Sequence, residues 1–132
     1  AIDPEMTVGQ VIGQIAGACI RHFRLNEARI VADCDGEALH QARIAIRRLR
    51  GALGFFGPAI HKSSLWKIRD ELRWLARSLA DARDVDVFIA QHEDLSRSDA
   101  AKLRSARRAA YAQAIAAIDS GSASTAATRS PT

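Results

Sequence analysis

The sequence contains few of the residues that mark disulfide-stabilised, membrane-spanning or exported proteins. Its two cysteines, Cys19 and Cys34, are too few for a disulfide scaffold or for a zinc site built on cysteine. No run approaches the ~20 apolar residues of a membrane-spanning helix, and the N-terminus lacks the charged-then-apolar order of a secretion signal. We therefore expect a protein of the reducing cytoplasm.

Signals of β-structure are also nearly absent. β-branched residues are scattered, alanine is abundant, and no Asn-Gly or Asp-Gly turn lies between segments of alternating polarity. Apolar residues instead recur with a helical period in five segments, which predicts an all-α fold, a small bundle of four to five helices. The expected helices run from an N-cap at Thr7 to about Val31, from Glu37 to Phe56 behind a cap at Asp35, from Ser63 or Ser64 to about Leu79, over a short segment capped by Asp81 or Asp84, and from Ser98 to about Ile118.

The length of 132 residues is enough for one hydrophobic core and therefore predicts one domain. The helical bundle is expected to occupy residues 7–119. Residues 1–6 are expected to be a native linker or a vector-derived remnant. Residues 120–132 contain no large apolar side chain, which predicts a disordered tail.

Acidic residues are missing from one quarter of the chain. Between Ala38 and Arg69 the sequence has seven lysines and arginines and two histidines, but no Asp or Glu. The remainder has twelve basic and fifteen acidic residues, so this segment accounts for the whole net charge of +4. Such a concentration favours a local anion-binding site over a generally basic surface.

The predicted helix over residues 37–56 carries a row of basic residues. His40, Arg43, Arg47 and Arg50 lie opposite its apolar stripe on a helical wheel, and Arg48 lies at the flank. Like charges at this spacing repel by a few tenths of a kcal/mol per pair. The planar fork of arginine suits the oxygens of phosphate or carboxylate groups. We therefore interpret the row as a candidate anion-binding site, with an ordinary exposed helix face as the alternative.

A second basic strip follows in the next predicted helix. Arg69, Arg73 and Arg77 recur every four residues at the border of its apolar face. Asp70 and Glu71 lie close in sequence, so ion pairing is an equal alternative to ligand binding for this strip.

Two runs of sequence resemble the signature of the CHAD family, the conserved-histidine α-helical domain. They are LHQARIAIRRLR at Leu39–Arg50 and LRWLARSLADARDVDV at Leu72–Val87, in the order that the family has them. The resemblance covers about Met6 to Ile118. It implies a helical domain that binds inorganic polyphosphate through a basic central pore, often beside a CYTH (triphosphate-tunnel) domain in one polypeptide, and that is not established as a catalyst by itself.

The resemblance also implies which residues bind polyphosphate. The implied residues are His40, Arg43, Arg47, Arg48, Arg50, Arg73 and Arg83, with Arg69 and Arg77 as additional candidates. No catalytic residue, metal ligand or cofactor is expected.

The sequence departs from the family pattern in two ways. The family has two related helical halves, and only the N-terminal half has a counterpart here, because His61-Lys62 and His92 lack the arginine pattern that should follow. Ala80 also stands where the family usually has glycine. A lone half would offer an open basic groove, and self-association through the outward-facing Trp74 would close it, so we consider a homodimer.

Two other classes of function are compatible with the basic helix. A helix with exposed arginines could enter the major groove of a nucleic acid, although aromatic residues, at 5%, are few for stacking on single strands. A phosphate-handling enzyme would use a metal or a phosphorylated His40. The surrounding arginines disfavour a cation at His40, so we expect binding and not catalysis.

Overall fold

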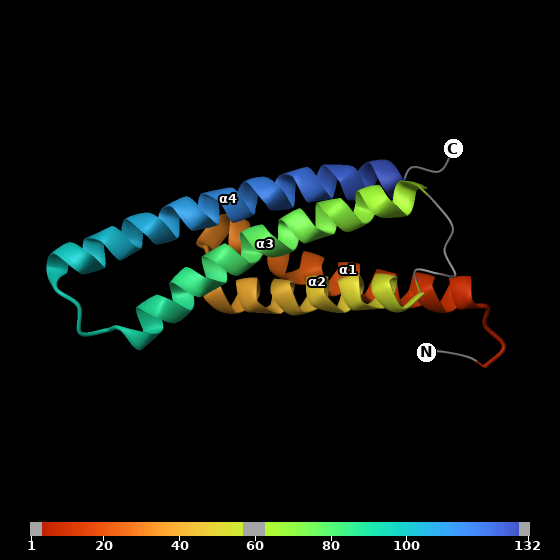
Figure 1. The fold of residues 1–132 in the computed structure, drawn as a ribbon, viewed down its shortest axis with the longest axis horizontal. Helices are drawn as coiled ribbons and strands as arrows, with labels where there is room; N and C mark the ends of the chain where they lie inside the picture. The colour runs from red at the N-terminus through yellow and green to blue at the C-terminus, as the bar shows by residue number, and fades with distance from the viewer. Residues whose placement is uncertain (1–3, 57–62, 130–132) are drawn as a thin grey trace.

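The computed structural model describes residues 4–56 and 63–129, and within these ranges it contains four α-helices and no strand. Figure 1 shows long helices whose axes lie roughly along the length of the molecule, with α2 beside α1 and α3 beside α4. Contacts between α2 and α3 join the two pairs. The predicted all-α fold is confirmed, and the helices are α1 (Val8–Asp33), α2 (Gly36–Phe56), α3 (Ser63–Gln91) and α4 (Arg97–Arg129).

Side chains cap the N-termini of α1 and α4. Thr7 and Gln10 form a capping box, in which the Gln10 N–H donates to Thr7 Oγ1 at 3.2 Å and the Thr7 N–H donates to Gln10 Oε1 at 2.9 Å. The prediction of Thr7 as N-cap is confirmed. At α4 the cap is Ser96, whose Oγ accepts from the Asp99 N–H at 3.2 Å, and not the predicted Ser98.

A tight turn joins α1 to α2. Cys34 ends α1 in the left-handed conformation, with φ 50°, and its N–H donates to the Ile30 carbonyl at 3.0 Å. The carboxylate of Asp35 then accepts from the backbone N–H groups of Glu37 and Ala38, at 3.0 and 3.2 Å. The predicted cap at Asp35 is confirmed, and it fixes the point from which α2 begins.

The structure corrects the prediction of a helix boundary at Asp81 or Asp84. α3 is one helix of 29 residues that passes through both aspartates. Its sequence contains neither glycine nor proline, and Ala80 stands at the point where a glycine would favour a break. Aspartate caps a helix only where the chain leaves the helical path, and nothing in this segment makes it leave.

The C-terminal segment also differs from the prediction. The sequence predicts a disordered tail over residues 120–132, whereas α4 continues to Arg129. Small residues, several of them alanine, are compatible with helix, and the nearest proline is Pro131, beyond the helix end. The expected break at Gly57-Pro58, residues 1–3 of the expected N-terminal linker and residues 130–132 of the expected tail lie outside the described residues.

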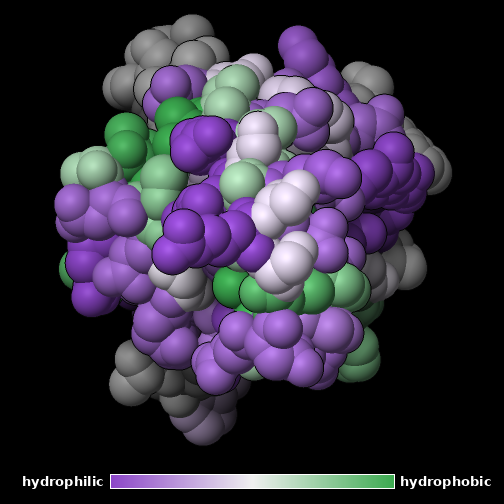
Figure 2. Space-filling model, turned by 90° about the vertical axis from the view of Figure 1, so that its left-hand side faces the viewer, coloured by the Kyte–Doolittle hydropathy of each residue, from purple (hydrophilic) through white to green (hydrophobic). Residues whose placement is uncertain are grey.

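Apolar side chains from all four helices form the core. The predicted buried stripe of α2 is confirmed by Leu39, Ala42, Ala45, Ile46, Leu49 and Leu53, each at most 9% exposed. The largest fully buried side chains elsewhere are those of Tyr111, Ile30, Leu79 and Ile118. Seen from the end that carries the α3–α4 connection, the surface is mostly hydrophilic, and apolar residues show in small separate patches (Figure 2).

Leu49→Arg should abolish cooperative folding. Leu49 is 9% exposed and packs in a cluster with Cys19 and Leu53, so an arginine there buries a charge without a partner at a cost of several kcal/mol. Thermal unfolding followed by circular dichroism measures the effect. The matched control, Arg48→Glu at the exposed neighbouring position, should change the free energy of unfolding by only about 0.5 kcal/mol. A Leu49→Arg protein that melts like the parent would contradict the assigned core.

Candidate anion-binding groove

A groove between α2 and α3 is the main hollow formed by the predicted site residues. It has a volume of about 460 Å³ and is open to solvent. Its lining consists of basic side chains and small or apolar ones, with no carboxylate: His40, Arg43, Ile44, Ile46, Arg47, Arg50, Arg73, Ala76, Arg77 and Ala80.

A second hollow continues the first one towards the C-terminal end of α2. It measures about 410 Å³ and shares Arg47, Arg50 and Arg73 with the first. Its other lining residues include Arg69, Leu53 and Leu72, and again no carboxylate. We refer to the two hollows together as the basic groove.

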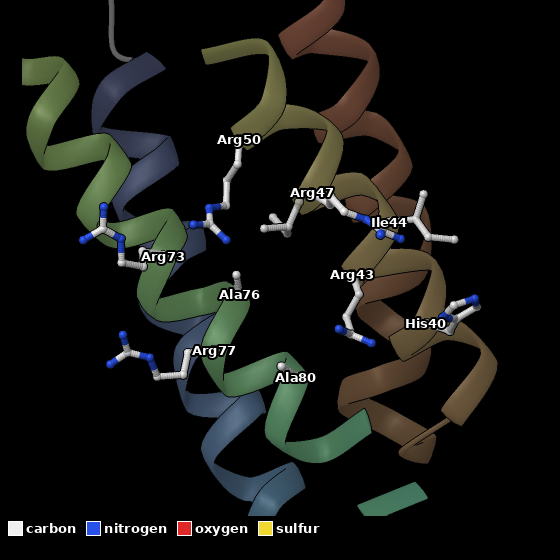
Figure 3. A pocket seen from close by; sticks show the side chains of 10 residues that line it. His40, Arg43, Ile44, Arg47, Arg50, Arg73, Ala76, Arg77 and Ala80 are labelled. Atoms are coloured by element: carbon white, nitrogen blue, oxygen red, sulfur yellow. The ribbon is translucent and has the colours of Figure 1, made fainter. Parts of the chain in front are cut away.

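Arginines of both helices line the basic groove, but their side chains take different directions. Figure 3 shows Arg43 and Arg50 extending from α2 towards α3, above Ala76 and Ala80. Arg73 and Arg77 extend from α3 on the side that faces away from α2. The two alanines leave the space between the helices open, because any larger side chain there would fill the floor over which Arg43 and Arg50 lie.

The positive charge of the groove has little internal compensation. Among the described residues, no ion pair with a carboxylate forms at Arg43, Arg47, Arg50, Arg73 or Arg77. Since these guanidinium groups carry donors in a planar fork, they are available to bind an anion that bridges the two helices. A ligand with several negative charges would offset the repulsion between these arginines, which remains when the groove holds no ligand.

His40 lies at the end of the groove nearest the start of α2. Its Nδ1 is buried and has no hydrogen-bond partner among the described residues. Nε2 is therefore the ring nitrogen left to contact a ligand, and in the neutral tautomer that carries hydrogen there it donates one hydrogen bond.

Arg69 has a structural contact as well as a place in the groove. Its Nη2 donates to the Leu53 carbonyl at 3.1 Å. That carbonyl belongs to the last four residues of α2, whose carbonyls have no partner within their own helix. Arg69 therefore ties the first turns of α3 to the C-terminal end of α2.

Two of the predicted site residues do not line the basic groove. Arg48 is exposed on the flank of α2 nearer α1, where its charge opposes the burial that raises the pKa of the Cys19 thiol. Arg83 is half-buried and lies two helical turns beyond Ala76, past the end of the groove lining. The structure thus brings together His40, Arg43, Arg47, Arg50, Arg69, Arg73 and Arg77.

A partly buried polar cluster, which sequence analysis does not predict, lies beyond the His40 end of the groove. Arg107 donates through Nε to Asp86 Oδ1 and through an Nη to the Cys34 carbonyl, both at 2.7 Å. The Tyr111 hydroxyl donates to Asp86 Oδ2, and the Arg107 guanidinium lies 4.3 Å from the centre of the Tyr111 ring. We call these four residues the Asp86 cluster. In the sequence, the one signal that could have pointed to this cluster is Tyr111, the single tyrosine, in an alanine-rich segment. That signal does not indicate which residue its hydroxyl contacts.

The described part of the chain offers no evident metal site and no membrane span. Over residues 4–56 and 63–129, no three His, Cys, Asp or Glu side chains are grouped to hold a metal ion. No helix in these ranges combines the length and apolar character needed to cross a membrane.

Comparison with known proteins assigns the family. The family model of the CHAD domain matches residues 14–129, which is most of the chain. The chain belongs to the CHAD family. A crystal structure of the CHAD domain from the plant Ricinus communis superposes with a TM-score of 0.67 at 29% identity, over 89% of this chain and 40% of that chain. This chain therefore spans less than half the length of that CHAD structure. The search of curated proteins found no match.

Ionisation of Tyr111 should require a pH well above the ordinary tyrosine pKa of about 10. Burial, and then the hydrogen bond to Asp86 and its charge, raise the pKa of Tyr111. The neutral form is favoured in the folded protein, so its contribution to stability is complete below about pH 10 and is lost as the pH rises further. Tyr111 is the only tyrosine, so tyrosinate absorbance reports it alone. If Tyr111 ionised at the same pH in the folded and in the urea-unfolded protein, its burial beside Asp86 would be contradicted.

Proposed function

We propose that the basic groove binds inorganic polyphosphate and that the chain acts as a binding module without a chemical step. The observation that carries this proposal is that arginines of α2 and α3 line one open groove whose lining contains no carboxylate, with Arg43 and Arg50 extending into the space between the two helices. Membership of the CHAD family agrees with a polyanionic ligand of this kind.

The binding mechanism is electrostatic. The row from His40 to Arg50 extends over ten residues, about 15 Å along the axis of α2. Arg73 and Arg77 also line the groove from α3, although their side chains extend away from α2. Successive phosphates of a flexible chain would accept hydrogen bonds from guanidinium forks on both helices, with release of condensed counterions. His40 Nε2 would add a hydrogen bond at one end of the row.

The groove supports polyphosphate better than nucleic acid. Its lining has no phenylalanine, tyrosine or tryptophan side chain on which a base could stack. Arg43 and Arg50 also extend towards α3, so α2 does not present them as a free helix would to a DNA major groove. A nucleic-acid-binding domain remains the second candidate.

A phosphate-handling enzyme is the third candidate. Hydrolysis would need a nucleophile or a general base, and His40 is the one such side chain in the lining of the basic groove. We propose binding without turnover, so the chain should release no phosphate from polyphosphate or nucleotides in the presence of magnesium. Sustained release that His40→Ala abolishes would favour the enzyme.

Two candidate partners belong to the same proposal. A second copy of the chain would close the open groove, and Trp74, which is 49% exposed on α3, is compatible with such a homodimer contact. The family resemblance makes a CYTH domain in the parent polypeptide a candidate neighbour. Sedimentation over a range of concentrations tests the homodimer. A mass that stays monomeric at every concentration would exclude it.

Calorimetric titration should show tighter binding of long-chain polyphosphate than of duplex DNA matched for charge. Because several ion pairs form, the polyphosphate association constant should fall roughly tenfold to a hundredfold for a fourfold rise in salt. Equal affinity for both polymers would support a nucleic-acid function or non-specific attraction. No binding of either would contradict the proposed site.

Arg47→Glu should weaken polyphosphate binding at least about tenfold, because it replaces two or more charge-assisted donors in the groove with a repelling charge. Arg48→Glu is the matched control: it makes the same change of net charge one residue away, outside the groove lining. Its effect should be limited to a small, salt-screened loss. Equal losses for the two variants would mean that net charge, and not the groove, determines binding.

A further inference from the structure

The Asp86 cluster joins parts of the chain that are far apart in sequence. Asp86 comes from α3, Arg107 and Tyr111 come from α4, and the Cys34 carbonyl comes from the turn between α1 and α2. The Asp86 side chain is only 14% exposed, and both of its oxygens accept a hydrogen bond. The Asp86 carboxylate therefore connects α3 to α4, and Arg107 connects both of these helices to the turn between α1 and α2.

The cluster bears directly on the start of α2. Gly36 is the first residue of α2, and a Cβ added there would lie 3.2 Å from Asp86 Oδ2. A residue without a side chain permits this close approach. Arg107 also holds the carbonyl of Cys34, the residue in the left-handed conformation. The turn before α2 is thus tied to α4 by a directional hydrogen bond, and the start of α2 packs closely against Asp86 of α3.

The same point adjoins one end of the basic groove. His40 lies one helical turn after Gly36, and Ala80, on the opposite wall, lies six residues before Asp86 on α3. Arg50, at the other end of the basic row, lies about 21 Å from Gly36 along the axis of α2, at ~1.5 Å per residue. That distant end has its own tie, the hydrogen bond from Arg69 to the Leu53 carbonyl.

We propose that Tyr111 and Arg107, acting through Asp86, are positioning residues for the polyphosphate site. They hold the start of α2 where His40 and Arg43 can meet the same phosphate chain as the arginines of α3. Hydrogen bonds to a carboxylate are directional, whereas contacts between small apolar residues such as Ala38 and Ala42 tolerate sliding. The inference rests on the proposed function, because it concerns the geometry of that site.

Tyr111→Phe tests the proposal, since it removes the hydroxyl donor and keeps the ring beneath Arg107. Polyphosphate affinity is measured well below the melting temperature of every variant. We expect Tyr111→Phe to weaken binding about threefold to tenfold, both alone and in an Arg50→Ala background. In a His40→Ala background the loss should largely disappear, because the effect acts through the His40 end of the groove.

Ile118→Val is the matched control for stability, because Ile118 is fully buried on the same helix and makes no hydrogen bond to the cluster. Its polyphosphate affinity should equal that of the parent chain. Unchanged affinity of Tyr111→Phe, equal losses in Tyr111→Phe and Ile118→Val, or the same loss in all three backgrounds would overturn the positioning role and leave the proposed function intact. Failure of the unmodified chain to bind polyphosphate would instead overturn the proposed function, and the positioning role with it.

Discussion

The packing of one face of α2 is the constraint on which the rest of the structure depends. Leu39, Ala42 and Ala45 are at most 1% exposed, and the stripe continues through Ile46 to Leu53. Each large apolar side chain buried in this way contributes about 1.5–3 kcal/mol. Repulsion between the arginines on the other face costs a few tenths of a kcal/mol per pair. Burial therefore outweighs repulsion, and α2 can hold uncompensated charge until a polyanion neutralises it.

The arginines of the basic groove and of the Asp86 cluster form two groups, which differ in whether the protein itself supplies partners for their charge. Arg107 has a carboxylate, a carbonyl and an aromatic ring as partners, so its charge is satisfied within the fold. Removal of one partner there would leave a half-buried charge uncompensated, which is costly. Arg47 and Arg50 lie at an open groove where water solvates them, so their lack of a protein partner costs little. The first arrangement stabilises the bundle, and the second leaves donors free for a ligand.

The continuity of α3 links these two arrangements. Asp81 and Asp84 have the residue type of helix caps, and local preference alone allows a break there. Leu79 and Ala82 are fully buried, however, and pack in the same core as Tyr111 and the alanines of α4. This packing favours an unbroken helix, and the unbroken helix carries Asp86 to a position where Arg107 reaches it. A break at Asp84 would have separated the wall of the groove from the cluster beyond its end.

Helical periodicity in the sequence was sufficient to determine which side of α2 is buried and that His40, Arg43, Arg47 and Arg50 share a face, because this depends on the geometry of one helix. Only the tertiary structure decided that Arg73 and Arg77 line the same groove, that Arg48 lies outside its lining, and that α3 has no break. It also brought Arg107 to Asp86 and to the Cys34 carbonyl, across 21 and 73 positions of sequence. Those relations follow from the packing of separate helices, which the period of any one helix does not encode.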